Sequence, residues 1–338
     1  MRVMEIRGEW SVDNIVAAER PTPEPGRRQV LLRMAAASLN YRDHVMARRG
    51  YGNRSGTLPL VPVSDGVGEV VAVGPDTTRF RVGDRVCPTF FQDWVSGPFK
   101  DEHWVSQLGG PRDGVMQEFM LIDEHAGVLV PGFLSDLEAA ALPCAGVTAW
   151  NAVAGAGGVK AGDVVLVQGT GGVALFALLF AKCQGARVIA LSSSEEKLER
   201  LRGLGADHVV NYRETPDWRK VARDLTGGLG VDRVVEVGGA ETLGQSLRAV
   251  RGGGTVSLIG VLSGALCNLN LGQVVTQGIR LQGVTLGSRD DFEDMNRAIA
   301  LHGIRPPVDG RVHAFDEVAA AIRSIPDGRH FGKICIAF

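Results

Sequence analysis

The chain has 338 residues, of which 45% are hydrophobic and 22% are charged, as in an ordinary globular protein. Its net charge of −2 gives no basic excess for nucleic acid or an anionic membrane, and its length predicts about two domains. The longest apolar run, residues 173–181, is too short to span a bilayer. The N-terminal MRVMEIRGEW has no apolar signal-peptide core, so we expect a cytoplasmic protein.

Short β-like runs broken by glycine and proline fill the first part of the chain: QVLLRMAA, GVGEVVAVG, DRVCPTF and EFMLI. This pattern predicts an irregular, partly antiparallel β domain. From Asp163 to Gly287, apolar strands alternate with helical segments, which is typical of βαβ units and a parallel sheet. The texture is mixed again from Ser288. We therefore predict a discontinuous β domain, residues 1–133 and 288–338, around a parallel α/β domain, residues 134–287, with a cleft between them.

The predicted sheet of the second domain has six strands: residues 164–168, 187–191, 208–212, 233–237, 255–261 and 280–286. A helix fits clearly between the second and third strands, in SSSEEKLERLRGLG, where a serine can serve as N-cap and Gly205 as the stop. The fold class is therefore α/β, with a doubly wound parallel Rossmann sheet beside an irregular, mainly β domain.

The strongest local signal is the turn in VVLVQGTGGVALFALLF, where a buried strand runs into Gly169-x-Gly171-x-x-Ala174 and then a helix. The first glycine permits a tight turn, the second lets the backbone approach a pyrophosphate, and the alanine allows close helix packing. In this strand, turn and helix context the pattern predicts dinucleotide binding. The residues expected to hold the phosphates are Gly169, Thr170, Gly171, Gly172 and Val173.

The end of the second predicted strand indicates which dinucleotide is bound. An NAD site expects an acidic residue here, to accept a hydrogen bond from the ribose 2′-hydroxyl. This chain instead has Ser192 and Ser193, with Lys197 close behind, and these groups favour the 2′-phosphate of NADP(H). The alternative is that the serines only cap a helix and the lysine is solvated. Tyr212 either covers the adenine-ribose phosphate or is an aromatic at the sheet edge.

Seven segments together resemble the medium-chain dehydrogenase/reductase superfamily across nearly the whole chain: SLNYRD, PVSDGVGEVVAVG, FRVGDRV, LPCAGVTAW, QGTGGVALFA, GADHVVNYRE and GKICI. The resemblance implies that the β domain is GroES-like and catalytic. It also places five further residues near the cofactor: Thr148, Gly238, Gly260, Val261 and Lys333. For Lys333, a solvated charge at a sheet edge is an equally open interpretation.

The resemblance also tests for zinc. Zinc members of the superfamily have a cysteine where this chain has Asn40, and a His-Glu pair where it has Ser64 and Asp65. Only Cys144 keeps a zinc-ligand type, whereas a catalytic zinc needs about three protein ligands. The lobe that carries four structural cysteines in zinc members corresponds to residues 88–115, which hold no cysteine. We therefore expect no metal. Cys144 is then a reactive thiol or a small buried side chain.

Without a metal, reduction is easiest when the acceptor is already activated. The expected function is NADPH-dependent hydride transfer to a quinone or an α,β-unsaturated carbonyl, as the resemblance to zinc-free quinone oxidoreductases implies. Asn40 and Tyr41 are the candidates for polarising the acceptor, with Tyr41 or solvent as proton donor. The alternatives are an alcohol dehydrogenase or carbonyl reductase, and a non-catalytic NADPH-binding protein. The family implies a homodimer paired through RLQGVTLG.

Five aromatic residues lie close together in the sequence: Phe90, Phe91, Trp94, Phe99 and Trp104. They form either an aromatic wall for a flat substrate or the packed interior of the lobe that zinc holds together in other members. We favour the second interpretation.

Overall fold

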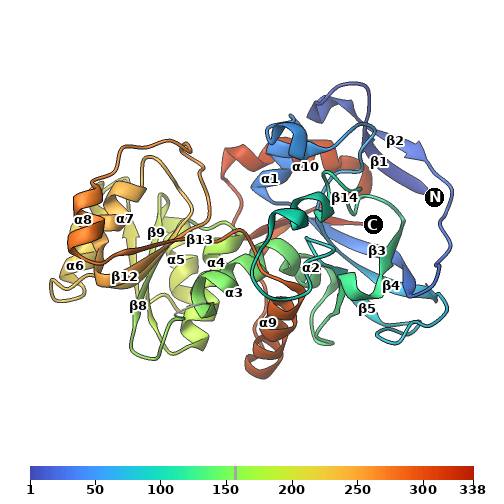
Figure 1. The fold of residues 1–338 in the computed structure, drawn as a ribbon. Coiled ribbons are helices and arrows are strands. Elements are labelled where there is room, and N and C mark those ends of the chain that lie inside the picture. The colour runs from blue at the N-terminus through green and yellow to red at the C-terminus, as the bar shows by residue number, and fades with distance from the viewer. Residues whose placement is uncertain (156–157) are drawn as a thin grey trace. The chain divides into compact units, whose positions relative to one another are not determined.

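The structure is a computed structural model that describes residues 1–155 and 158–338. These residues form two compact units, 1–147 with 287–338 (unit 1) and 148–286 (unit 2), whose elements are labelled in Figure 1. The division falls after Val147 rather than after residue 133, because helix α2 (Asp136–Ala140) packs on strands of unit 1. No helix of the described ranges is both long and apolar enough to cross a membrane.

Unit 2 contains the six-stranded parallel sheet that the sequence predicts. Its strands are β8 (Val164–Gln168), β9 (Arg187–Ser192), β10 (His208–Asn211), β11 (Val231–Glu236), β12 (Val250–Leu258) and β13 (Arg280–Gly283). The spatial order β10-β9-β8-β11-β12-β13 is that of two βαβαβ halves joined at β8. The predicted α/β fold class is confirmed. β12 ends earlier than predicted, at Leu258, and β13 ends at Gly283.

The described part of unit 2 also contains helices, most of which bury apolar side chains. They are α3 (Val147–Ala154), α4 (Gly172–Cys183), α5 (Glu195–Gly203), α6 (Trp218–Asp224), α7 (Leu243–Ala249) and α8 (Leu271–Thr276). Every residue of β8 is buried, as expected for a central parallel strand. α4 adds Phe176 and Phe180, which are fully buried and stack on each other. Gly205 follows the end of α5 with φ of 95°, as a helix stop requires.

Unit 1 is built on a mainly antiparallel sheet of β3 (Gln29–Ser38), β4 (Asp65–Val73), β5 (Arg85–Pro88), β6 (Phe119–Asp123), β7 (Gly127–Leu129), β14 (Val308–Ala314) and β15 (Lys333–Ala337). The C-terminal strand β15 pairs antiparallel with β3 and parallel with β14. A separate two-stranded ribbon consists of β1 (Arg2–Ile6) and β2 (Ile15–Glu19). Side chains of the sheet and of the ribbon form one apolar core that includes Leu32, Val70 and Ile336.

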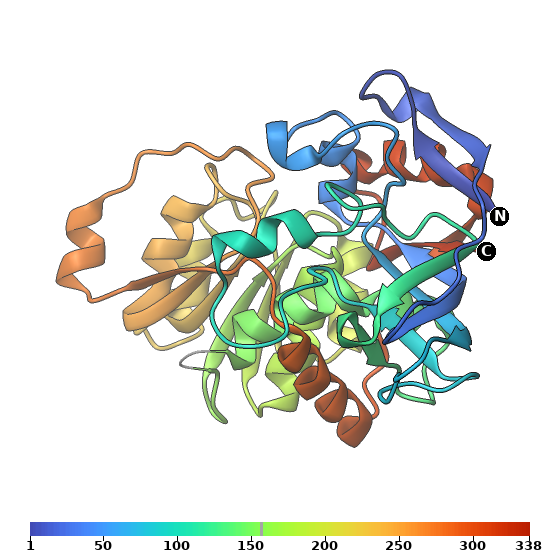
Figure 2. The ribbon, with the colours of Figure 1, turned by 45° about the vertical axis from the view of Figure 1, so that its right-hand side comes forward.

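The other helices of unit 1 are α1 (Tyr41–Met46), α9 (Arg289–His302) and α10 (Val318–Ser324). Short turns complete it: η1 (Val12–Asn14), η2 (Gly52–Ser55), η3 (Asp101–Ser106), η4 (Glu124–Ala126), η6 (Phe315–Glu317), η7 (Ile325–Asp327) and the π-helical η5 (Leu142–Gly146). α10 lies beside the β1–β2 ribbon (Figure 2). Its Arg323 pairs with Asp13 of η1 at 2.5 Å.

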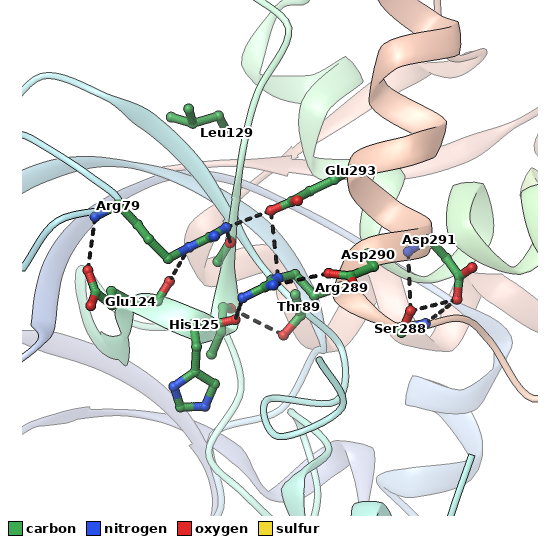
Figure 3. Close-up of polar contacts among 12 residues, drawn as sticks. Arg79, Thr89, Glu124, His125, Leu129, Ser288, Arg289, Asp290, Asp291 and Glu293 are labelled. Atoms are coloured by element: carbon green, nitrogen blue, oxygen red, sulfur yellow. Dashed lines mark hydrogen bonds and ion pairs between the residues drawn. The ribbon is translucent and has the colours of Figure 1, made fainter. Parts of the chain in front are cut away.

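Charged side chains fasten α9 to the sheet of unit 1 (Figure 3). Arg79 donates to Glu293 at 2.6 Å, and its backbone amide donates to the carboxylate of Glu124 at 2.9 Å. At the start of the helix, the hydroxyl of Ser288 accepts from the amide of Asp291, whose carboxylate accepts from the amide of Ser288. This capping box satisfies helix amides that otherwise lack partners.

A valine in a strained backbone conformation precedes Ser64 and Asp65. Val63 has φ of 71°, a region that β-branched residues rarely enter, and it is only 1% exposed. Its carbonyl accepts from the amide of Val115 at 2.8 Å, and Gly114 lies so close that a β-carbon there would come within 2.0 Å of the same oxygen. The surrounding chain therefore holds Val63 in a conformation that costs on the order of 1–3 kcal/mol.

Val63→Gly is expected to destabilise the protein much less than a buried valine normally would. Glycine loses the buried side chain but also relieves the backbone strain, so the two effects partly cancel. The matched control is Val61→Gly, because Val61 is equally buried and has no positive φ. In urea unfolding we expect Val63→Gly to cost about 1–3 kcal/mol less than Val61→Gly. Equal costs would mean that Val63 carries no strain.

Candidate functional site

The carboxyl ends of neighbouring strands in unit 2 bring most of the predicted cofactor residues to one edge of the sheet. β8 ends at Gln168 before the predicted phosphate turn, and β9 ends at Ser192. β11 ends at Glu236 and β12 at Leu258, just before Gly238 and Gly260. In doubly wound sheets this edge is where ligands bind, at the point where the strand order reverses.

The turn between β8 and α4 leaves open space beside its glycines. Gly169 has φ of 79°, and a side chain at Gly169 or Gly171 would meet no atom within 4 Å, so the space beside the turn is open. α4 begins at Gly172, and its N-cap, Gly171, offers no side-chain cap to the first amides. Those amides and the positive end of the helix dipole fit an anionic dinucleotide. Thr170 and Val173 lie in the same turn and first helical turn.

The residues expected to bind the ribose lie at the ends of the next two strands. Ser192 is buried and its carbonyl accepts from the amide of Tyr212 at 3.0 Å, so β9 and the end of β10 stay in register. Ser193 is half-buried, and Lys197 lies in the first turns of α5. Tyr212 follows β10 rather than ending it, and 41% of it is exposed.

A buried carboxylate that the sequence analysis missed organises this edge. Glu236 is 0% exposed, and one carboxylate oxygen accepts from the amides of Gly238 at 2.8 Å and Gly239 at 3.0 Å. The other oxygen accepts from the side chain of Gln168 at 2.8 Å and from the hydroxyl of Ser246. Glu236 therefore joins the end of β8 to the loop after β11. An acidic residue inside a predicted buried strand was the available signal.

The loops after β11 and β12 line a half-open pocket of about 160 Å³ in unit 2. Gly260 and Val261 line it, together with Leu243 of α7. Gly260 approaches the neighbouring loop so closely that a β-carbon would lie 2.3 Å from the carbonyl oxygen of Val237. Thr148, the other predicted cofactor residue of unit 2, is buried near the start of α3.

In unit 1, three neighbouring strands bring four polar side chains together at one end of the sheet, where the backbone amide of Cys144 in η5 joins them, and we call this group the polar cluster. The register pairs Ser38 of β3 with Cys335 of β15 and with Asp65 of β4. Asn40 follows β3, and Lys333 begins β15. The members of the polar cluster are Asn40, Ser64, Asp65, Cys144 and Lys333.

Asp65 and Asn40 are the centre of this hydrogen-bond network. The carboxylate of Asp65 accepts from the hydroxyl of Ser64 at 2.7 Å and from the backbone amide of Cys144 at 2.9 Å. The ammonium of Lys333 donates to the side-chain oxygen of Asn40 and lies 3.7 Å from Asp65. Lys333, predicted near the cofactor, is thus placed among the residues of unit 1.

Tyr41 and Asp43 lie beside the polar cluster on α1. Tyr41 is 43% exposed, and its hydroxyl has no hydrogen-bond partner among the described residues. Asp43 is buried and accepts from the backbone amide of Asn40 at 2.7 Å, which fixes the start of α1. Burial raises the pKa of Asp43 to about 6, although the charge of Arg42 opposes this shift.

Asp43→Asn is expected to gain stability relative to the parent protein as the pH rises. The folded pKa of Asp43, about 6, lies above its ordinary value of 3.8, so proton binding favours the folded state. This contribution is complete below pH 3.8 and is lost as the pH rises through about 6. The measurement is urea unfolding of both proteins at pH 4.5, 5.5, 6.5 and 7.5. Across this range, the difference in free energy of unfolding between Asp43→Asn and the parent is expected to change by on the order of 1–2 kcal/mol. A constant difference would contradict the raised pKa.

The donors of the polar cluster do not fit a catalytic zinc ion. Zinc prefers thiolate, imidazole and carboxylate ligands, whereas Asn40 and Ser64 offer an amide and a hydroxyl. Burial, reinforced by the charge of Asp65, raises the pKa of the Cys144 thiol, which opposes the thiolate that a metal requires. Lys333 already places a positive charge against Asn40 and Asp65. Across residues 1–155 and 158–338, no group of three or more His, Cys, Asp or Glu is placed to hold a metal.

The parallel sheet with its glycine turn, together with the β unit and its polar cluster, defines a two-domain, nucleotide-dependent dehydrogenase class. Family models agree: residues 26–132 match the alcohol dehydrogenase GroES-like domain, and residues 172–300 match the zinc-binding dehydrogenase model. The chain belongs to the medium-chain dehydrogenase/reductase superfamily and is an oxidoreductase.

Relatives and solved structures cover almost the whole chain. A zinc-type alcohol dehydrogenase-like protein of Schizosaccharomyces pombe is 41% identical over 96% of this chain and 95% of its own length. An acryloyl-coenzyme A reductase of Sulfurisphaera tokodaii is 28% identical over 94% and 95%. A putative alcohol dehydrogenase from Sinorhizobium meliloti has a TM-score of 0.93 at 41% identity, covering 100% and 98%. A structure described as an NAD-dependent alcohol dehydrogenase has a TM-score of 0.90 at 34% identity, covering 100% of both chains.

Proposed function

We propose that this protein is an NADPH-dependent, zinc-independent reductase that transfers hydride to a quinone or an α,β-unsaturated carbonyl compound. The single observation that carries this proposal is the polar cluster, in which the amide of Asn40, the hydroxyl of Ser64 and the ammonium of Lys333 lie together. Such groups suit an acceptor that is already activated, because they need only stabilise the negative charge that develops on its oxygen. The acryloyl-coenzyme A reductase relative acts on this class of acceptor.

Unit 2 holds the cofactor in this proposal. When bound, NADPH supplies a hydride. The free amides at the start of α4 bind the pyrophosphate, and Ser193 with Lys197 favours the 2′-phosphate. The absence of an acidic residue at the end of β9 supports NADPH over NADH. In unit 1, Asn40 helps to orient the acceptor, while the free hydroxyl of Tyr41 donates a proton.

A panel of acceptors tests this proposal. The purified protein is assayed for oxidation of NADPH and NADH with quinones, enones, enoyl thioesters, aldehydes and ketones, each with and without a chelator. We expect turnover of quinones or enones, preference for NADPH, and no effect of the chelator. Turnover of aldehydes or ketones that is lost on chelation would instead support a zinc alcohol dehydrogenase, the second candidate, which the name of the S. pombe relative favours.

The edge of unit 2 supports the proposal of a homodimer. Strand β13 is bonded to β12 on one side, and the segment before it exposes Leu266, Leu271 and Val275 at 92%, 66% and 79%. A second copy would cover this apolar edge and continue the sheet. Light scattering after size-exclusion chromatography is expected to show a dimer. A monomer at micromolar concentration would contradict the proposal.

A further inference from the structure

Lys333 is an almost completely buried cation whose placement the sequence does not explain. It is 2% exposed, although lysine is rarely buried without a paired charge. It begins β15, and the amide of Leu39 donates to the carbonyl of Ile334 at 2.9 Å, which holds the start of β15 against the end of β3. The side chain therefore lies beside Asn40 because of strand pairing between the two ends of the chain.

The contacts of Lys333 leave part of its ammonium group without a partner. An ammonium has three N–H donors, and one of them bonds to the side-chain oxygen of Asn40. Asp65 lies 3.7 Å away, beyond hydrogen-bond distance, and its carboxylate is already bonded to the Ser64 hydroxyl and the Cys144 amide. Within the described residues, two donors of this buried cation therefore have no acceptor.

We propose that the ammonium of Lys333 is the catalytic electrophile of this protein and acts in place of a metal ion, binding the carbonyl oxygen of the acceptor. Asn40 and Asp65 are positioning residues: the side-chain oxygen of Asn40 accepts a hydrogen bond from the ammonium, and the carboxylate of Asp65 lies 3.7 Å from it. This inference rests on the proposed function. It replaces direct polarisation by Asn40 with polarisation by the cation that Asn40 holds.

For an enone, the proposed reaction is reduction of the carbon–carbon double bond by a hydride and a proton. Bound NADPH would supply a hydride, with its electron pair, to the β-carbon and would thereby be oxidised to NADP⁺. The π electrons of the carbon–carbon double bond move toward the carbonyl, and its oxygen becomes an enolate oxygen. A free N–H of Lys333 donates to that oxygen and lowers the energy of the negative charge. The α-carbon then takes a proton from Tyr41 or water, which restores the carbonyl and releases Lys333.

Substitution of Lys333 separates catalysis from cofactor binding. Lys333→Met keeps most of the side-chain volume and removes the charge, whereas Lys333→Ala leaves a cavity. For both variants we expect kcat to fall about 100- to 1000-fold, while the Kd for NADPH, measured by nicotinamide fluorescence, changes less than about threefold. The matched control is Lys160→Met, an exposed lysine of unit 2, which is expected to keep the parent kcat.

Chemical rescue gives a second readout that a structural role would not show. Methylammonium at tens of millimolar is expected to restore about tenfold or more of the kcat of Lys333→Ala. The same salt is not expected to rescue Lys333→Met, whose side chain fills the site. A Kd for NADPH that rises in parallel with the loss of kcat would overturn the inference and assign Lys333 to the cofactor. An unchanged kcat would overturn it equally.

A measurement without turnover distinguishes failure of this inference from failure of the proposed function. In thermal unfolding without cofactor, methylammonium is expected to raise the Tm of Lys333→Ala by a few degrees more than tetramethylammonium at equal ionic strength. The parent protein, whose site already holds an ammonium, is expected to show no such difference. If no acceptor in the panel is reduced, the proposed function fails, and this shift still decides whether the site binds a cation. Equal Tm values in both salts would overturn the cation site.

Discussion

Replacing Glu236 with alanine is expected to cost on the order of 3–5 kcal/mol of folding stability and to weaken NADPH binding at least tenfold. The carboxylate accepts from the amides of Gly238 and Gly239 and from the side chains of Gln168 and Ser246. Each buried donor left without an acceptor costs about 1–3 kcal/mol, and water entering the cavity recovers only part of this. The loop after β11 would also lose its anchor to the end of β8.

The measurements are urea unfolding and fluorescence titration with NADPH. The control is Glu241→Ala, which removes an exposed carboxylate from the same loop and is expected to change stability by less than about 0.5 kcal/mol. Glu236→Gln keeps the shape of the side chain but replaces one acceptor by a donor, so an intermediate loss is expected. A Glu236→Ala protein as stable as the control would show that the loop does not depend on this carboxylate.

Replacing Phe91 with alanine is expected to cost about 3–5 kcal/mol, the usual range for a buried phenylalanine. Phe91 is 2% exposed, and its ring centroid lies 4.7 Å from that of Phe90, 5.2 Å from Phe99 and 5.8 Å from Trp104. These rings meet edge to face or tilted, as favourable aromatic pairs do. They fill the interior of the lobe formed by residues 88–115. By the resemblance described above, this lobe corresponds to the one that carries four structural cysteines in zinc members.

Urea unfolding of Phe91→Ala, with Phe91→Leu and the exposed Val105→Ala as controls, measures this packing. Phe91→Leu is expected to lose less than Phe91→Ala because most of the apolar volume remains, and Val105→Ala should be nearly neutral. The KM of the best acceptor is expected to stay within about twofold in Phe91→Leu. A large rise in KM with unchanged stability would instead support the aromatic wall for substrate.

Features that depend on neighbours in the sequence were predictable. The turn between β8 and α4 could be predicted because a buried strand, Gly169, Gly171 and a helix follow one another directly. The alternation of strands and helices indicated a parallel sheet, and right-handed βαβ connections restrict how such a sheet can be ordered. The ends of the strands were predicted less exactly. β13 ends at Gly283, where its pairing with β12 ends. The composition of the chain does not show where a neighbouring strand stops offering hydrogen bonds.

Features that depend on distant pairing were not predictable. Lys333 and Asn40 are 293 positions apart, and only the pairing of β15 with β3 brings the ammonium to the amide. The buried role of Glu236 likewise depends on α7, whose Ser246 donates to it, and on β8, whose Gln168 does the same. No local pattern marks either contact, because hydrogen bonds between separate elements form only after the strands are in register.

The amino-acid sequence alone was sufficient for the family, the α/β class and the glycine turn, since hydrophobic period and backbone freedom act over a few residues. It was also sufficient to show that Asn40, Ser64 and Asp65 differ from the metal ligands of zinc members. What stands in that place emerged only from the folded chain. The pairing of the C-terminal strand places the ammonium of Lys333 beside Asn40 and Asp65 in the polar cluster. Such pairing joins residues far apart in the sequence, so no local sequence pattern indicates it.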